Sequence, residues 1–263
     1  MGSFRFKQFE VEQNHSAMKV NTDAVLLGAW MSVPGGETVR ALDIGTGTGV
    51  IALMAGQRLS ETGVCAHIDA VEIDADACQD AAANFNAAPW VGISFGLHNV
   101  PLQEFYGSGA ADGAAGAAGY DLIFSNPPYF ISSLKNDTQA KTTARHTDTL
   151  SQRELLFYST PLLKEGGTLA IILPVVEGEE LLRKVEFMAN AAVAAGGDTA
   201  ALFPSRICYV HTVERKPAKR LMLEFAKCTP SARPVLQRQQ LVMMSGGANT
   251  PEYACLVGDF YIR

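Results

Sequence analysis

The sequence predicts an α/β fold: a mostly parallel seven-stranded sheet with helices on both faces and an antiparallel C-terminal hairpin. Short apolar runs of strand length recur along the chain and alternate with amphipathic or alanine-rich segments of helical length, which is typical of a parallel sheet. A glycine-rich turn at 45–49 directly follows the first of these runs. Two alternating segments, 207–214 and 220–226, flank a turn at 216–218 and predict the hairpin.

The size of the chain, 263 residues, favours one large domain. We expect a single domain over 1–263, with an N-terminal extension and helix at 1–38, a core at 39–230 and a tail at 231–263. With 48% hydrophobic and 18% charged residues the chain belongs to the globular class and not to the disordered one.

Targeting and metal-binding patterns are absent from the sequence. No stretch approaches the ~18 apolar residues of a membrane span, and the segment at 4–7 lacks the apolar region of a signal peptide. The five cysteines and five histidines are dispersed without metal-ligand spacing. We therefore expect a cytoplasmic monomer with reduced thiols, no metal and no membrane partner.

The glycine-rich turn is the first candidate ligand site. It joins an apolar strand that contains Asp43 to a helix that begins near Val50, so a ligand can approach bare backbone beside a helix N-terminus. Val50 stands where a dinucleotide fingerprint needs a small residue, and there is no Walker lysine. The pattern Asp43-x-Gly45-x-Gly47-x-Gly49 instead favours the S-adenosylmethionine loop of Rossmann-like class I methyltransferases, which yield S-adenosylhomocysteine as product.

Further candidate cofactor residues lie around this turn. Glu72 ends the second strand 23 positions after Gly49, where an acid can accept both ribose hydroxyl protons; a plain exposed carboxylate is the alternative. Pro101 occupies the region after the third strand where many such enzymes place an acid, so the cofactor adenine would rely on the backbone near Leu102. The expected cofactor-binding residues are Lys19, Thr22, Asp43, Gly45, Thr46, Gly47, Gly49, Glu72, Ile73, Leu102 and Asn126.

Lys19 and Thr22 come just before and at the start of a predicted helix, with Thr22 as its N-cap. Two interpretations of these residues are open: they contact the amino acid end of a ligand, or they are a solvated lysine and an ordinary helix cap.

The motif at 126–129, Asn-Pro-Pro-Tyr, follows a buried strand at 120–125. Its prolines stiffen the turn and donate no N–H, so backbone carbonyls stay free as acceptors. Together with the Asn126 amide oxygen and the flat Tyr129 ring, they suit a planar amino group that attacks without a strong base. The alternative is a turn that only ends a strand.

Two basic clusters are candidates for holding a substrate phosphate. The first is a polar loop that contains Lys135, Lys141, Arg145 and His146. The second surrounds the hairpin turn and consists of Arg206, Arg215, Lys216, Lys219 and Arg220. Because the net charge is −6, binding of RNA would require such a local positive patch.

The chain resembles the family of tRNA (adenine-N6)-methyltransferases that modify adenine 37 of a valine tRNA. The resemblance runs nearly end to end, through the segments 4–9, 18–30, 43–49, 126–130, 144–147 and 259–261. It implies S-adenosylmethionine as methyl donor, tRNA as partner, and a target base turned out of its stack onto Tyr129. We expect Asn126, Pro127, Pro128 and Tyr129 to act in catalysis, and Tyr129, Phe130, Arg145, His146 and Lys216 to bind the substrate. Pro101 departs from the aspartate that is common in the family.

Two other functions remain open on the sequence alone. A glutamine side chain is also a planar amide, and protein glutamine N5-methyltransferases use the same Asn-Pro-Pro-Tyr motif. A non-catalytic nucleotide-binding module is the third possibility.

Overall fold

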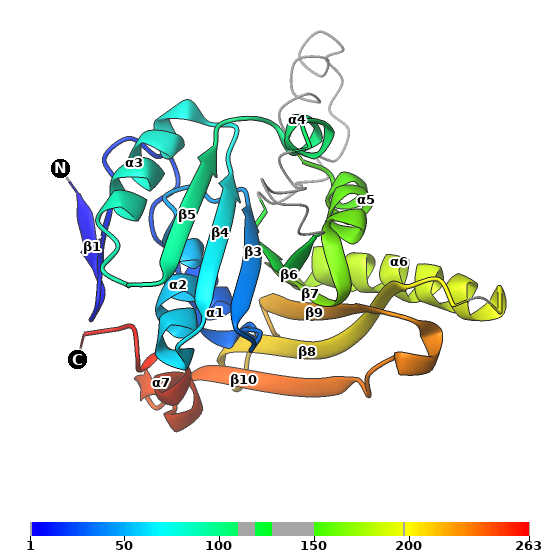
Figure 1. Ribbon diagram of the computed structural model, residues 1–263. Coiled ribbons are helices and arrows are strands. Elements are labelled where there is room, and N and C mark those ends of the chain that lie inside the picture. The colour runs from blue at the N-terminus through cyan, green and yellow to red at the C-terminus, as the bar shows by residue number, and fades with distance from the viewer. Residues whose placement is uncertain (1, 110–118, 128–149, 197, 263) are drawn as a thin grey trace, which may run out of the picture.

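The computed structural model describes residues 2–109, 119–127, 150–196 and 198–262. Within them a nine-stranded sheet runs in the order β11-β10-β8-β9-β7-β6-β3-β4-β5, and β1 and β2 form a separate hairpin (Figure 1). The strands are β1 Ser3–Arg5, β2 Glu10–Glu12, β3 Thr38–Ile44, β4 Cys65–Val71, β5 Ile93–His98, β6 Tyr120–Ser125, β7 Leu163–Pro174, β8 Ala201–Val213, β9 Arg220–Cys228, β10 Gln237–Ser245 and β11 Ala248–Asn249. The helices are α1 Thr22–Trp30, α2 Val50–Thr62, α3 Ala75–Asn86, α4 Leu102–Gly107, α5 Gln152–Leu162, α6 Val175–Ala194 and α7 Pro251–Val257.

The central strands are parallel and apolar, as the sequence predicts for strands covered on both faces. Strand β3 pairs with β4 and with β6, so that Ile44 lies opposite Val71 and Asp43 opposite Phe124. One hydrophobic cluster contains α1 and α2, and another contains α4, α5 and α6. The carboxyl ends of β3, β4 and β6 therefore meet at one edge of the sheet, the upper edge in Figure 1.

The sheet has two more strands than the seven that the sequence predicts. Strand β9 is antiparallel to β7 and β8, which confirms the hairpin, but the tail adds β10, parallel to β8, and the short β11. The segment 237–240 is polar and exposed at every position, so it lacks the alternation that reveals a strand. Helix α7, with the buried Tyr253 and with Phe260 just beyond it, anchors the end of the tail.

The N-terminal extension forms the predicted outer hairpin and then α1. Helix α1 begins at Thr22, but its N-cap is Asn21, whose side-chain oxygen accepts from the Ala24 backbone N–H at 3.0 Å. Thr22 is therefore the first helical residue and not the cap that the sequence predicts. Both residue types suit a cap, and only the backbone geometry distinguishes the adjacent positions.

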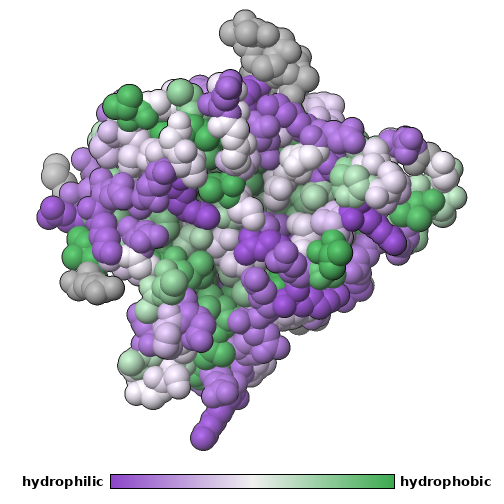
Figure 2. All heavy atoms as spheres, turned by 60° about the horizontal axis from the view of Figure 1, so that its bottom comes forward, coloured by the Kyte–Doolittle hydropathy of each residue, from purple (hydrophilic) through white to green (hydrophobic). Residues whose placement is uncertain are grey.

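The surface seen from below is mainly hydrophilic, with apolar side chains gathered in small patches (Figure 2). No helix in the described ranges is long and apolar enough to cross a membrane.

A buried ion pair joins β8 and β9 to the end of α1. The Glu224 side chain is 2% exposed, and its carboxylate accepts from Arg206 Nη1 at 3.1 Å and from the Ser32 backbone N–H at 2.5 Å. The Arg206 guanidinium also lies 4.2 Å from the centre of the Trp30 ring. Arg206 is thus a structural residue and does not belong to the basic cluster at the hairpin turn, where the sequence places it.

Replacing Arg206 by methionine should lower the free energy of unfolding by roughly 3 kcal/mol, because it leaves the Glu224 carboxylate without its cation. The control is Lys184→Met, which breaks an exposed pair with Glu180 and should cost less than about 1 kcal/mol. Urea denaturation measures both, and equal losses would contradict the role of the buried pair.

Candidate functional site

A cavity of about 320 Å³ opens at the carboxyl edge of the sheet. Residues from five segments far apart in the sequence line it, together with Leu150 and Glu154: 16–18, 44–45 with Gly47, 71–74 with Ala77, 100–103 and 125–127. The parallel register of β3, β4 and β6 brings three of these segments together. The site therefore stands where ligands bind in open α/β sheets, outside the carboxyl ends of the strands.

Two glycines of the turn face empty space, and the third packs against a helix. Gly45, Gly47 and Gly49 have φ angles of 73°, 55° and 81°, which favour glycine. A side chain at Gly45 or Gly47 would meet no atom within 4 Å, and both residues line the cavity. At Gly49 a Cβ atom would lie 2.6 Å from the Phe85 ring, so this glycine permits packing against α3 and is not a lining residue.

Glu72 holds the glycine turn in place. One carboxylate oxygen accepts from the Gly47 N–H at 2.8 Å, and the other accepts from the N–H groups of Ile73 at 2.8 Å and Asp74 at 3.0 Å. Glu72 and Ile73 both line the cavity. A carboxylate has lone pairs for about four bonds, so Glu72 retains capacity to accept from a ligand hydroxyl.

Asp43 lies beneath the turn and is fully buried. Its Oδ2 atom accepts from the Thr46 hydroxyl at 2.7 Å, whereas Oδ1 has no partner among the described residues. Burial is the main cause that raises the pKa of Asp43 to about 7, and the charge of Glu72 adds to it. Neither Asp43 nor Thr46 lines the cavity, so any contact they make with a ligand is indirect.

The corner at the end of β6 closes the other side of the cavity. The Ser125 hydroxyl donates to the Ile44 carbonyl at 2.7 Å and ties the end of β6 to that of β3. Asn126 and Pro127 follow at once, and both line the cavity. The other predicted residues of this region, Pro128, Tyr129, Phe130, Arg145 and His146, lie outside the described residues, as do Lys135 and Lys141.

The region around Leu102 contributes apolar wall. Leu102 is buried, begins α4 directly after Pro101, and lines the cavity with it. In place of an acid, Asn99 donates its side-chain amide to the carbonyls of Glu72 at 2.9 Å and Ile73 at 3.2 Å. Asn99 thus fixes the backbone beside Glu72, which the sequence alone does not indicate.

Lys19 and Thr22 do not line the cavity. Thr22 is exposed, and Lys19 Nζ donates to the carbonyls of Gln13 at 2.5 Å and Ser16 at 2.9 Å. Lys19 therefore shapes the segment before α1, and the neighbouring residues 16–18 form the cavity wall.

Two polar residues of α3 attach that segment to the core. The Asp80 carboxylate accepts from the backbone N–H groups of Asn14 at 3.0 Å, His15 at 3.0 Å and Ser16 at 2.7 Å. The Asn84 amide donates to the Glu12 carbonyl at 2.9 Å and to the Thr48 carbonyl at 2.8 Å.

Sequence reasoning missed Asp80 and Asn84. Each is 2% exposed, and they lie four residues apart on one face of an alanine-rich helix. The sequence signal that could have identified them is a polar residue at a helix position where the apolar periodicity predicts burial.

The hairpin turn between β8 and β9 lies at the same edge of the sheet, because Arg220 pairs with Pro174 at the end of β7. Arg220 Nε donates to Asp23 Oδ2 at 2.7 Å, which joins the turn to the start of α1. Lys216 is exposed in this turn and does not line the cavity. No group of three potential metal ligands is found in the part of the chain that the structure describes.

The sequence matches the family model described as "Methyltransferase small domain" over residues 12–195. It is 38% identical to the tRNA1(Val) (adenine(37)-N6)-methyltransferase of Trichodesmium erythraeum over 99% of this chain and 98% of that protein. It is also 38% identical to the protein of the same name from Tolumonas auensis over 99% of this chain and 97% of that protein. The chain belongs to this methyltransferase family.

Solved structures agree with this family at the level of the fold. A predicted O-methyltransferase of Agrobacterium tumefaciens superposes with a TM-score of 0.56 at 18% identity, over 90% of this chain and 96% of that one. M. jannaschii TYW2 in complex with AdoMet superposes with a TM-score of 0.50 at 9% identity, over 86% of this chain and 85% of that one. The predicted Rossmann-like class I methyltransferase fold is confirmed.

Asp43 should make stability depend on pH. Its pKa rises from 3.8 in the unfolded chain to about 7 in the fold, so the folded state keeps a proton that the unfolded state has lost. Stability is therefore greatest below the lower value and falls as the pH rises toward the higher one.

Between about pH 5 and about pH 8, the wild type should lose roughly 2 kcal/mol of unfolding free energy relative to Asp43→Asn. Chemical denaturation of both proteins at the two pH values measures this. Parallel pH profiles would show that the Asp43 carboxyl does not titrate in this range.

Proposed function

We propose that this protein transfers a methyl group from S-adenosylmethionine to the exocyclic N6 amine of an adenine in tRNA, adenine 37 of a valine tRNA. The observation that carries the proposal is the cavity that runs from the open glycines Gly45 and Gly47 to Asn126 and Pro127. Membership of the family supplies the substrate, which the cavity by itself does not specify.

The residues around the glycine turn fit S-adenosylmethionine. Gly45 and Gly47 leave bare backbone, Glu72 can accept from a ribose hydroxyl, and Leu102 offers an apolar wall to a flat base. The unpaired Oδ1 atom of the buried Asp43 suits an indirect contact with an ammonium group through water. When bound, this cofactor supplies an electrophilic methyl group.

The corner at Asn126 and Pro127 fits the amine that receives the methyl group. The Asn126 amide oxygen and the Pro127 carbonyl can each accept an N–H of the amine, which holds the nitrogen lone pair toward the cofactor side of the cavity. The nitrogen would form its bond to the methyl carbon as the carbon–sulfur bond breaks and S-adenosylhomocysteine leaves, and the methylated amine would then lose one proton to water, so no strong base is required. The proposed roles of Pro128, Tyr129, Phe130, Arg145 and His146 rest on the family resemblance, in which the ring of Tyr129 stacks on the flipped base.

The reaction is tested by supplying labelled methyl donor and total tRNA to the purified protein. Label in nucleic acid that ribonuclease releases is the expected result. Label that only protease releases would identify a protein glutamine methyltransferase, and no incorporation with intact cofactor binding would favour a binding module.

Replacing Asn126 by alanine should lower kcat by roughly 100-fold or more, because loss of one oriented acceptor near the reacting group has about this effect. The dissociation constant for S-adenosylmethionine should change less than about threefold, since the glycine turn and Glu72 are retained. Single-turnover rates and calorimetric titration separate the two quantities. An equal loss of rate and cofactor affinity would contradict the assigned role.

Asp80 should act as a positioning residue for the cofactor. Asp80→Asn replaces acceptor lone pairs with an amide that cannot accept three N–H bonds, so the wall at 16–18 should loosen and the cofactor Kd should rise by roughly tenfold. The control is Asp76→Asn, an exposed position on the same helix. A loss of thermal stability in Asp80→Asn with unchanged cofactor Kd would show a purely structural role.

A further inference from the structure

Positive charge is concentrated in one part of this acidic protein. The segment 201–245, which forms β8, β9 and β10, contains eight lysines and arginines but only two acidic residues. The whole chain has a net charge of −6, so the remainder is strongly acidic. The three strands therefore form a basic unit at one end of the sheet.

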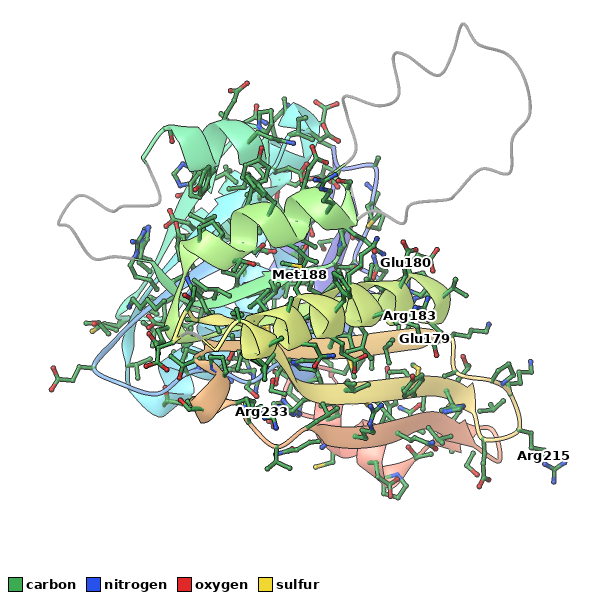
Figure 3. All side chains as sticks on the ribbon, turned by 90° about the vertical axis from the view of Figure 1, so that its right-hand side faces the viewer. Glu179, Glu180, Arg183, Met188, Arg215 and Arg233 are labelled. Atoms are coloured by element: carbon green, nitrogen blue, oxygen red, sulfur yellow. The ribbon has the colours of Figure 1, made fainter. Side chains whose placement is uncertain are left out.

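Five of these cations are exposed: Arg215, Lys216, Lys219, Arg233 and Arg238. The other three have structural contacts, since Arg206 pairs with Glu224, Arg220 with Asp23, and Lys227 donates to the Leu163 carbonyl. Arg215 and Arg233 lie at opposite ends of the layer formed by β8, β9 and β10 (Figure 3). The exposed cations thus lie at both ends of this layer.

Between these two ends, α6 covers one face of β8, whereas the same face of the neighbouring β10 is accessible. Ile207 lies opposite Arg238 and packs in the same cluster as α6. Because side chains alternate between the two faces of a sheet, every second residue from these two points to the face that carries α6. Tyr209 and Gln240 are such a pair, and they are half-buried and exposed respectively. An exposed polar strand face with flanking cations suits contact with a nucleic-acid backbone.

Three acids of α6 lie beside this face, and Arg238 is the cation that acts on Tyr209 together with two of them, Glu179 and Glu186. Glu179 accepts from the Tyr209 hydroxyl at 3.3 Å, and Glu180 pairs with Lys184 at 2.7 Å. The ion pair of Glu180 with Lys184 reduces the repulsion of a phosphate group by Glu180, and the exposed cations of β10 and of the two turns supply the attraction.

We propose that this face, from the β8–β9 turn to Arg233 and Arg238, binds the phosphate backbone of the RNA stem that carries the target adenine. The inference rests on the proposed function, because it assigns a surface to the same substrate. Strand β8 is three strands from β6, a separation of roughly 14 Å, and β8 from Arg206 to Val213 spans roughly 23 Å. These lengths suit one face of a helical stem whose loop reaches Asn126.

The remote end of the surface gives the sharpest test, because Arg233 and Arg238 lie away from the cavity. We expect Arg233→Gln combined with Arg238→Gln to raise the KM for valine tRNA by roughly 5- to 30-fold. The slope of log Kd for tRNA against log salt should decrease by about one for each phosphate interaction that the substitutions remove. The Kd for S-adenosylmethionine and the melting temperature should equal those of the wild type.

The control variant is Arg5→Gln, which removes an exposed arginine from β1 at the other end of the molecule and should leave the KM for tRNA unchanged. If the wild type methylates tRNA and the double variant keeps the same KM and salt slope, the RNA surface is refuted while the function stands. If the wild type does not methylate tRNA but labels protein, the proposed function fails and this inference fails with it.

Discussion

The parallel pairing of β3 with β4 on one side and β6 on the other is the constraint on which the site depends. Because these strands run in one direction and in register, the glycine turn, Glu72 and Asn126 arrive at the same edge although 81 residues separate Gly45 from Asn126. The Ser125 hydroxyl donates to the Ile44 carbonyl and fixes the alignment of β6 with β3 at their carboxyl ends. Any slip of β6 would carry the acceptor corner away from the glycines.

The cavity is organised before a ligand enters it. Glu72 orders the turn through the Gly47 N–H, Asn99 orders the backbone of Glu72, and Asp80 holds the wall at 16–18. This arrangement lowers the conformational entropy that binding would otherwise have to remove. The buried carboxyl of Asp43 lowers stability as the pH rises from its unfolded pKa of 3.8 toward about 7, the pattern expected where a site retains a poorly solvated group.

The sequence predicted the central sheet, the hairpin and the order of the elements, because apolar runs and glycine turns are local signals. The strand β10 escaped prediction, since the polar side chains at 237–240 conceal a strand at the edge of the sheet. At the site, Gly45, Gly47 and Glu72 all line the cavity, and their role in holding the cofactor stays a prediction. Asp80 and Asn84 were missed because their partners are backbone groups distant in the sequence, and no local pattern encodes such a contact. Thr46 and Lys19, in contrast, match the expected pattern in sequence but turn inward or toward their own segment.

In the proposed function, this acidic protein binds RNA through the basic unit of β8, β9 and β10 and methylates it at the Asn126 corner. The most direct test of this account is mass spectrometry of the nucleosides of purified valine tRNA from cells that carry the gene and from cells that lack it. The account predicts N6-methyladenosine at position 37 in the first tRNA and unmodified adenosine there in the second. The same methylated nucleoside at position 37 in both would contradict it.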